Sequence, residues 1–166
     1  MGLSAPTLFT KDHIVAGFDC GNDTLNGWLS DTALKNQLSH ASKTYVACKD
    51  NVVQGYYCLA SGSVERTSAP GSISRKMPDP IPVIVLGRLA VDLSARESGL
   101  LRGKHLLKDA IFRTLAVSQS IGVRALLVHT IDEAARDFYL RYGFKESRID
   151  PMTLLLPIKD IESMLE

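Results

Sequence analysis

The stretch from Leu86 to Gly103 joins a strand pattern, a glycine-bearing loop and the start of a helix, which is the layout of a pyrophosphate site. Backbone N–H groups at a helix N-terminus are unpaired and lie at the positive end of the helix dipole, so a loop entering a helix can bind phosphate. Glycines allow close backbone approach, and Arg96, Arg102 or Lys104 can add positive charge. The same layout also occurs where a chain merely reverses direction, so both interpretations stay open for this stretch alone.

A second stretch, 134–144, reads Ala-Ala-Arg-Asp-Phe-Tyr-Leu-Arg-Tyr-Gly-Phe and follows a buried strand pattern. By residue type alone, Tyr139 and Tyr142 are typical of aromatic side chains in a core or at its rim. A phenol can also act as an acid, because an ordinary tyrosine has a pKa of about 10 and stays protonated at neutral pH.

The two stretches together, in this order and separated by one helix and one strand, resemble the cofactor-binding and C-terminal motifs of GNAT acetyltransferases. The resemblance implies that Tyr139 is the general acid, which protonates the CoA thiolate as it leaves. It also implies that backbone groups of Leu89, Ala90 and Val91 hold the pantetheine arm of acetyl-CoA and polarise the acetyl carbonyl. The residues that it implies in pyrophosphate binding are Arg96, Ser98, Gly99, Arg102, Gly103 and Lys104.

Segments spread from about residue 18 to residue 144 narrow the resemblance to the GNAT toxins of bacterial type II toxin–antitoxin modules. They are Phe18-Asp-Cys-Gly21, Leu25-Asn-Gly-Trp-Leu29, Ala41-Ser-Lys-Thr-Tyr-Val46, Gly55-Tyr-Tyr57 and Leu86-Gly-Arg-Leu-Ala-Val-Asp92. The resemblance implies acetylation of the free α-amino group on aminoacyl-tRNA, which stops translation. It implies direct attack of the amine on the thioester, a ribbon–helix–helix antitoxin as partner, and a cytoplasmic homodimer.

Basic side chains near the expected cleft would bind the tRNA, because phosphate contacts supply affinity and salt dependence. Arg75 and Lys76 are the first choice, and Lys35 and Arg88 are added. For each of these side chains the alternative is a solvated surface charge.

The loop departs from the family motif, which is Arg or Gln, two residues, Gly, one residue, then Gly or Ala. Counting from Arg96 puts Gly99 in place but Leu101 at the second small position. A leucine side chain there would obstruct the approach of the backbone to a diphosphate. Either the loop bulges and still holds the pyrophosphate with Gly99, Arg102 and Gly103, which we favour, or the chain is a degenerate fold that only binds an antitoxin.

Two further questions stay open at this point. The acceptor could instead be a small amine, a peptide or a protein lysine, as for other GNAT N-acetyltransferases. Glu65, Asp92 and His129 are candidates for a general base by residue type, but the sequence selects none of them. His129 lies in a buried strand pattern, so we expect it to be a core histidine.

The chain has 166 residues, of which 45% are hydrophobic, and a net charge of +1. These values suit one domain over residues 1–166 and exclude a disordered chain or a strongly basic nucleic-acid coat protein. Cys20, Cys48 and Cys58 form no CxxC pair, so neither a disulfide framework nor a metal site is indicated. No secretory signal and no apolar run of the roughly 20 residues that span a bilayer is present, so we expect no membrane association.

Strand patterns alternating with helix patterns predict an α/β sheet that positions these residues. The resemblance specifies a GNAT fold, with a central mixed, mostly antiparallel sheet that is splayed in the middle and flanked by helices (α+β). We expect strands at 7–9, 44–48, 52–60, 83–86 continuing through 89–91, 125–131, 144–146 and 152–156. We expect helices at 24–38, 104–120, 133–141 and 158–165, and loops at 61–82 and 92–103.

Overall fold

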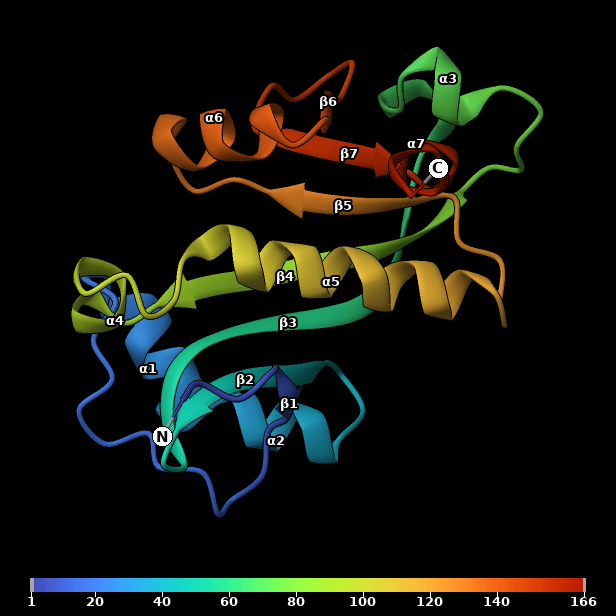
Figure 1. The fold of residues 1–166 in the computed structure, drawn as a ribbon. Coiled ribbons are helices and arrows are strands. Elements are labelled where there is room, and N and C mark those ends of the chain that lie inside the picture. Colours follow the sequence, from blue (N-terminus) through green and yellow to red (C-terminus); the bar gives the residue numbers. More distant parts are fainter. Residues whose placement is uncertain (1, 166) are drawn as a thin grey trace. The chain divides into compact units, whose positions relative to one another are not determined.

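The computed structural model describes residues 2–165, whose seven strands form one sheet in the order β1-β2-β3-β4-β5-β7-β6 (Figure 1). The strands are β1 Thr7–Leu8, β2 Lys43–Lys49, β3 Val52–Val64, β4 Ile81–Val91, β5 Ala125–His129, β6 Lys145–Glu146 and β7 Thr153–Pro157. The helices are α1 Asp23–Asp31, α2 Ala33–Leu38, α3 Gly71–Ser74, α4 Leu93–Glu97, α5 Gly103–Ser118, α6 Glu133–Arg141 and α7 Ile158–Met164. Strand β4 pairs with β5 in parallel, whereas β2 pairs antiparallel with both β1 and β3, and β7 with both β5 and β6. The expected mixed, mostly antiparallel sheet with flanking helices is confirmed.

The chain divides into two compact units that alternate along the sequence. The first unit contains the residues up to Ala60 together with Gly87–Ala110, and the second contains Ser61–Leu86 together with the residues from Ile111 onward. Strands β3 and β4 and helix α5 each contribute residues to both units. The expectation of a single domain over residues 1–166 stays a prediction.

Strands β2 and β3 of the first unit, both expected from the sequence, form an antiparallel hairpin. Asp50 and Asn51 have φ angles of 50° and 69°, the left-handed region that a two-residue hairpin turn requires at both positions. Helix α1 begins after Asn22, whose side chain accepts a hydrogen bond from the Leu25 N–H at 3.0 Å. The single helix expected at 24–38 is wrong, because Thr32, with φ −121°, leaves helical geometry and separates α1 from α2.

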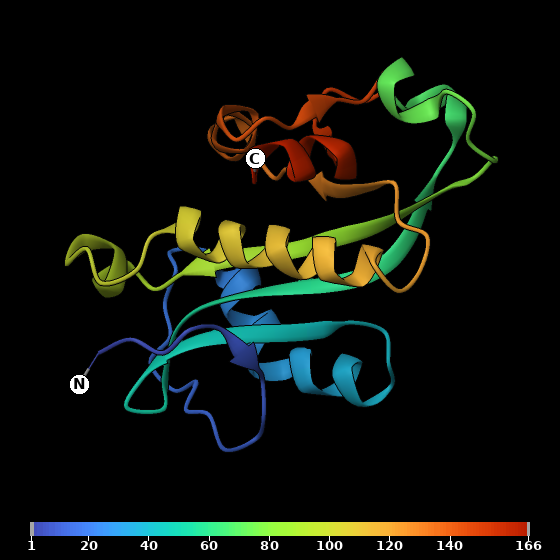
Figure 2. The same cartoon turned by 45° about the vertical axis from the view of Figure 1, so that its right-hand side comes forward.

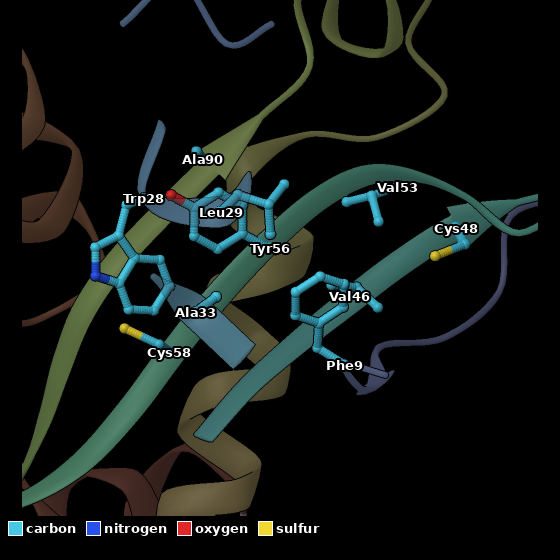
Figure 3. Packing of buried hydrophobic residues seen from close by; sticks show 10 residues of the cluster. All are labelled: Phe9, Trp28, Leu29, Ala33, Val46, Cys48, Val53, Tyr56, Cys58 and Ala90. Carbon is cyan, nitrogen blue, oxygen red and sulfur yellow. The ribbon is translucent and has the colours of Figure 1, made fainter. Parts of the chain in front are cut away.

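Apolar side chains of α1, α2, β2 and β3 form the core of the first unit (Figure 3). The Trp28 and Tyr56 rings are stacked with their centroids 5.8 Å apart, and the Tyr56 hydroxyl donates to the Leu25 carbonyl at 2.7 Å. Helix α1 is thereby fixed to β3, and α2 packs on β2 (Figure 2). The free thiols of Cys48 and Cys58 are buried in the same core.

Both loops expected from the sequence contain regular structure. In place of the long loop at 61–82, β3 continues through Val64, a 3₁₀ turn covers Arg66–Ser68, α3 follows, and β4 already begins at Ile81. Ile73 and Ile81 are fully buried in the second unit, but such widely spaced apolar residues give no periodic signal. In place of the loop at 92–103, α4 begins directly after Asp92, whose side chain accepts from the Ser94 N–H.

The second unit is built on β5, β7 and the end of β4 that precedes Gly87. Residues 83–86 of β4 pair with 125–128 of β5, and β5 ends at His129 rather than at the expected Ile131, which is exposed. Helices α6 and α7 pack on β7. The predicted start of α6 is confirmed, because Asp132 Oδ1 accepts from the Ala135 N–H at 2.8 Å. Among residues 2–165 no helix is both long enough and apolar enough to cross a membrane.

Candidate active site

The end of β4 offers backbone groups of the kind expected for pantetheine binding. The Asp92 N–H donates to the Gln54 carbonyl of β3 at 2.8 Å. Successive residues of a strand direct their backbone groups to opposite edges, so the backbone groups of Leu89 and Val91 point to the edge away from β3. The side chains of Ala90 and Val91 are buried and fix the strand in the first unit. Binding of acetyl-CoA by Leu89, Ala90 and Val91 stays a prediction.

The Phe18–Gly21 segment holds this strand end through two aspartates. The Asp19 N–H donates to Asp92 Oδ1 at 2.9 Å, and the Leu93 N–H donates to the Asp19 carbonyl at 2.8 Å. Asp19 Oδ1 in turn accepts from the Gly21 N–H at 2.9 Å and from Asn26 Nδ2 at 3.1 Å. The Gly21 N–H, followed by the Asn26 amide, lowers the pKa of Asp19, so its carboxylate stays charged at neutral pH.

The pKa of Asp92 is also lowered. Partial burial raises it, but hydrogen bonds from the Ser94 hydroxyl and from the backbone N–H groups of Asp19, Ala95 and Ser94 outweigh that effect. A charged carboxylate at this position also caps the N-terminus of α4.

The residues expected to hold the pyrophosphate follow on α4 and the turn after it. Arg96 lies in the last turn of α4, and Gly99 has φ +78°, a conformation that favours glycine. The Ser98 hydroxyl lies within hydrogen-bonding distance of both the Ala95 carbonyl and the Leu100 N–H, so it shapes the turn itself. Arg102 and Lys104 are exposed, and Gly103 is half-buried as the first residue of α5.

Leu101 does not obstruct this turn. Its side chain is only 1% exposed, and a Cβ added at Gly55 of β3 would lie 2.5 Å from Leu101 Cδ2. The leucine therefore points into the core of the first unit, under the turn that contains Gly99. This placement favours the bulged loop over the degenerate fold, and it leaves Gly99, Arg102 and Gly103 on the loop surface.

His105 completes the start of α5, and the sequence interpretation missed it. Its Nδ1 atom accepts a hydrogen bond from the Arg102 N–H at 3.1 Å, so the imidazole caps the helix. The sequence signal for such a cap is a polar side chain at the third position of a helix, which can accept from the N–H of the residue that precedes the helix.

Tyr139 lies on α6 in the second unit, with its side chain only 6% exposed. Its ring meets the Phe138 and Phe144 rings edge-on, with centroids 5.0 Å and 5.3 Å away. Burial raises the pKa of the phenol, which therefore stays protonated throughout the neutral range. Among residues 2–165 its hydroxyl has no hydrogen-bond partner, so the proton remains available to a ligand. These are the properties of a proton donor, whereas Tyr142 is 36% exposed at the end of the same helix.

Arg75 and Lys76 are exposed in the second unit, directly after α3. A Cβ added at Gly71 would lie 3.3 Å from Arg75 Nη2 and 3.2 Å from Arg148 Nη2, so two guanidinium groups flank this glycine. Arg148 is exposed as well. The sequence interpretation missed Arg148, because a residue so far along the chain from Arg75 gives no local signal.

Lys35 and Arg88 belong to the first unit, whereas Arg75 and Lys76 belong to the second. Lys35 is exposed on α2. The Arg88 guanidinium lies over the Trp28 ring, 4.7 Å from its centroid, and is half-buried. Arg88 thus has a packing role, and tRNA binding by either residue stays a prediction. Residues 2–165 contain no group of three or more His, Cys, Asp or Glu side chains that could hold a metal ion.

Comparison with known proteins places this geometry in a family. No family model matches the chain. The "tRNA-acetylating toxin" of Mycobacterium tuberculosis is 44% identical over 164 residues, which cover 99% of this chain and 98% of that protein. The structure of AtaT complexed with acetyl-methionyl-tRNAfMet has a TM-score of 0.90 and 29% identity, over 99% of both chains. A tyrosine-to-phenylalanine mutant of AtaT, bound to the C-terminus of the antitoxin AtaR and to acetyl-CoA, has a TM-score of 0.83 and 26% identity, over 99% of both chains.

The sheet order, the turn before α5 and these structural likenesses define the class as GNAT acetyltransferases. Within that class, the chain belongs to the family of tRNA-acetylating toxins, because its full-length identity to such a toxin is 44%.

Proposed function

We propose that this chain is a toxin that transfers the acetyl group of acetyl-CoA to the α-amino group of aminoacyl-tRNA and so inhibits translation. The observation that carries the proposal is the Tyr139 phenol. Its ring is buried, its pKa is raised, and its hydroxyl has no recorded partner among residues 2–165, in a chain of the tRNA-acetylating family.

In this reaction the cosubstrate is bound by the first unit. Backbone groups of Leu89 and Val91 hold the pantetheine arm and polarise the acetyl carbonyl, and the turn with Gly99 and Gly103 holds the pyrophosphate. Positive charge comes from Arg96, Arg102 and Lys104, which are all exposed. The amine attacks the thioester carbon directly, and Tyr139 donates its proton to the thiolate that leaves.

The tRNA is bound through its phosphates by basic side chains of the second unit. Arg75, Lys76 and Arg148 are exposed, and the first and last of them flank the same glycine. No carboxylate forms an ion pair with any of the three among the described residues, so their charges are available to an anion. A guanidinium pair is suited to phosphate oxygens, because each group presents several donors in one plane.

The toxin is neutralised by an antitoxin of the ribbon–helix–helix class and acts as a homodimer in the cytoplasm. The support for an antitoxin is that the AtaT mutant was solved with the C-terminus of AtaR. Light scattering of the purified chain measures the oligomeric state, and a mass corresponding to one copy would contradict the dimer.

Incubation of the protein with radiolabelled acetyl-CoA and total charged tRNA tests the activity. We expect label in the tRNA fraction that is released as N-acetyl amino acid when the ester bond is hydrolysed. Label on a small amine, a peptide or a protein lysine, with none on tRNA, would favour the alternative substrate classes. Absence of acetyl-CoA binding by calorimetry would favour the degenerate fold that only binds an antitoxin.

A further inference from the structure

His129 is the last residue of β5, and its side chain is exposed instead of lying in the core as expected from the sequence. Its Nδ1 atom lies 2.9 Å from the hydroxyl oxygen of Thr153, the residue opposite it on the antiparallel strand β7. The Thr153 hydroxyl donates to Asp150 Oδ2 at 2.8 Å. An imidazole, a hydroxyl and a carboxylate therefore form one hydrogen-bonded chain, entirely within the second unit.

This series of hydrogen bonds fixes the tautomer of the His129 imidazole. A threonine hydroxyl has a single proton, and an ionised carboxylate can only accept. Since the Thr153 proton is donated to Asp150, the bond between Thr153 and His129 requires Nδ1 to carry a proton. In the neutral imidazole the remaining nitrogen, Nε2, then holds an unprotonated lone pair. No hydrogen bond to Nε2 is recorded among residues 2–165, and the ring is exposed.

Asp150 is held in its ionised form. Hydrogen bonds from the Met152 N–H first and from the Thr153 hydroxyl second lower the pKa of this carboxyl. The segment that carries Asp150 is also tied to α6, because Arg136 Nε donates to the Pro151 carbonyl at 2.8 Å. The same guanidinium forms an ion pair with Glu146 at 2.7 Å. Arg136 lies one turn before Tyr139 on α6, so one residue connects the segment of Asp150 to the helix of the proposed acid.

The other two candidates for a base each lack one property that a base requires: the carboxylate of Asp92 is engaged in hydrogen bonds, and that of Glu65 is not positioned. Both carboxylate oxygens of Asp92 accept hydrogen bonds, Oδ1 from the Asp19 N–H and Oδ2 from the Ser94 N–H. Glu65 precedes the 3₁₀ turn at Arg66–Ser68, and nothing recorded positions its carboxylate. Among the three, only His129 combines an oriented side chain with an accessible lone pair.

We propose that His129 is the general base of the acetyl transfer, with Thr153 and Asp150 as positioning residues that orient the imidazole so that Nε2 is the nitrogen left to accept a proton. This inference rests on the proposed function, since it assigns the residue that prepares the α-ammonium group of aminoacyl-tRNA. In a general-base role, Nε2 takes one proton from the ammonium group and passes it to solvent.

The protons and electron pairs of the reaction then balance. The neutral amine attacks the acetyl carbon, the C–N bond forms and the C–S bond breaks, and the electron pair of that bond leaves on sulfur. The thiolate takes the Tyr139 proton, and the phenolate is reprotonated by the second proton that the nitrogen releases. The products are the N-acetylated aminoacyl-tRNA, CoA as the free thiol, and the proton that His129 gave to solvent.

The variant His129→Asn tests the assignment. An asparagine amide can take the place of Nδ1–H as donor to Thr153, but it has no basic nitrogen in place of Nε2. We expect kcat/KM for aminoacyl-tRNA at pH 6.5 to fall by about 100-fold, the usual lower range for loss of a general base. The KM for acetyl-CoA is expected to stay within about twofold. His13→Asn, on a histidine of the first unit whose Nδ1 accepts from the Thr10 N–H and whose ring stacks on Phe9, is the matched control and is expected to keep full activity.

The pH dependence separates a base from a structural residue. A free α-amino group has a pKa of about 8, so at pH 8.5 most of the substrate is already neutral. We therefore expect the deficit of His129→Asn to shrink to less than about tenfold at pH 8.5. The charged group that faces His129 is Asp150, on the same segment as Thr153, whereas Arg136 contacts that segment at the Pro151 carbonyl and is paired with Glu146. Added imidazole is expected to restore part of the activity of His129→Ala at pH 6.5.

Two further variants test the positioning residues. Thr153→Ser keeps the hydroxyl and is expected to keep activity within about threefold, whereas Thr153→Val is expected to lose about tenfold at pH 6.5. Full activity of His129→Asn at pH 6.5 would overturn the proposal. An equal deficit at both pH values without rescue by imidazole would overturn it too. If the wild-type protein itself transferred no acetyl group to charged tRNA, the proposed function would fail first, so the two failures are distinguishable.

Discussion

The backbone N–H of Asp19 donates to Asp92 Oδ1 at 2.9 Å, across 73 positions of sequence. Asp92 is the residue at which β4 ends and α4 begins, so this bond fixes the point where the chain turns away from the sheet. The backbone groups of Leu89 and Val91 lie just before that point, and the turn with Gly99 lies just after it. The Asp-Cys-Gly segment therefore holds the end of the strand that finishes in Val-Asp, which explains why both motifs occur in one chain.

The variant Asp92→Ala removes the acceptor of this bond and the cap of α4. Loss of a helix cap costs about 1 kcal/mol, which corresponds to about a fivefold change in an equilibrium constant. The lost cap and hydrogen bond would otherwise fix the backbone next to Leu89 and Val91, which are expected to bind acetyl-CoA. We therefore predict that the KM for acetyl-CoA rises about five- to tenfold with little change in kcat. Steady-state kinetics measure the KM, and calorimetry measures the affinity for acetyl-CoA. An unchanged affinity would contradict the role, and Asp31→Ala on the exposed face of α1 is the control.

The same carboxylates predict how stability depends on pH. The pKa values of Asp19 and Asp92 are lowered in the folded protein, so the folded form binds fewer protons than the unfolded form near pH 4. Their contribution to the free energy of unfolding is complete above the unfolded pKa of about 4 and disappears as the pH falls through the folded values. We expect the urea concentration at the midpoint of unfolding to decrease as the pH is lowered from 5 to 3. In Asp92→Asn we expect this decrease to be smaller. An equal slope in the variant would contradict this.

Local signals predicted much of the fold, because caps and tight turns are decided by neighbours in sequence. Asn22 and Asp132 cap the expected helix starts of α1 and α6, and Asp50–Asn51 forms the turn between the expected strands β2 and β3. The interpretations that were wrong depended on distant contacts. Ile73 is buried by strands far from it in sequence, so no local pattern predicts α3 and the 3₁₀ turn before it.

The candidate site divides in the same way. Tyr139 was predicted from two motifs taken together, at 86–103 and 134–144, and the structure adds the burial that raises its pKa. The direction of the Leu101 side chain could not be read from the loop sequence, because it depends on the absence of a side chain at Gly55. His129 was expected in the core, since a strand pattern does not reveal that β5 ends at that residue.

Replacing Tyr139 by phenylalanine removes the proton donor and keeps the ring that packs against Phe138 and Phe144. We expect kcat to fall by about 10²–10³-fold, with unchanged melting temperature and unchanged affinity for acetyl-CoA. Stopped-assay kinetics with charged tRNA measure the rate. Tyr142→Phe is the matched control, because it changes an exposed tyrosine at the end of the same helix. A variant of Tyr139 with wild-type kcat would remove the phenol from the mechanism.

Gly55 and Leu101 are predicted to be energetically coupled. An alanine Cβ at position 55 would lie 2.5 Å from Leu101 Cδ2, so Gly55→Ala forces the leucine to move and costs about 1–3 kcal/mol. Leu101→Ala leaves a cavity and costs about 2–5 kcal/mol. In the double variant the new methyl group occupies part of that cavity, so the combined loss of unfolding free energy is smaller than the sum. Urea denaturation of the four proteins measures the coupling, and strict additivity would show that the two side chains do not meet.

Arg75, Lys76 and Arg148 are predicted to contribute to tRNA affinity through phosphate contacts alone. Each lysine or arginine that neutralises a phosphate releases a counterion, so its removal lowers the slope of log affinity against log salt by about 1. We expect Arg75→Ala and Arg148→Ala each to raise the KM for charged tRNA about three- to tenfold at low salt, and to leave the KM for acetyl-CoA unchanged.

Because the two guanidinium groups flank the same glycine, the double variant should lose less tRNA affinity than the product of the two single losses if one phosphate bridges them. Lys49→Ala, an exposed charge at the end of β2, is the control for net charge. Equal salt slopes for the wild type and the double variant would mean that the tRNA does not contact this pair.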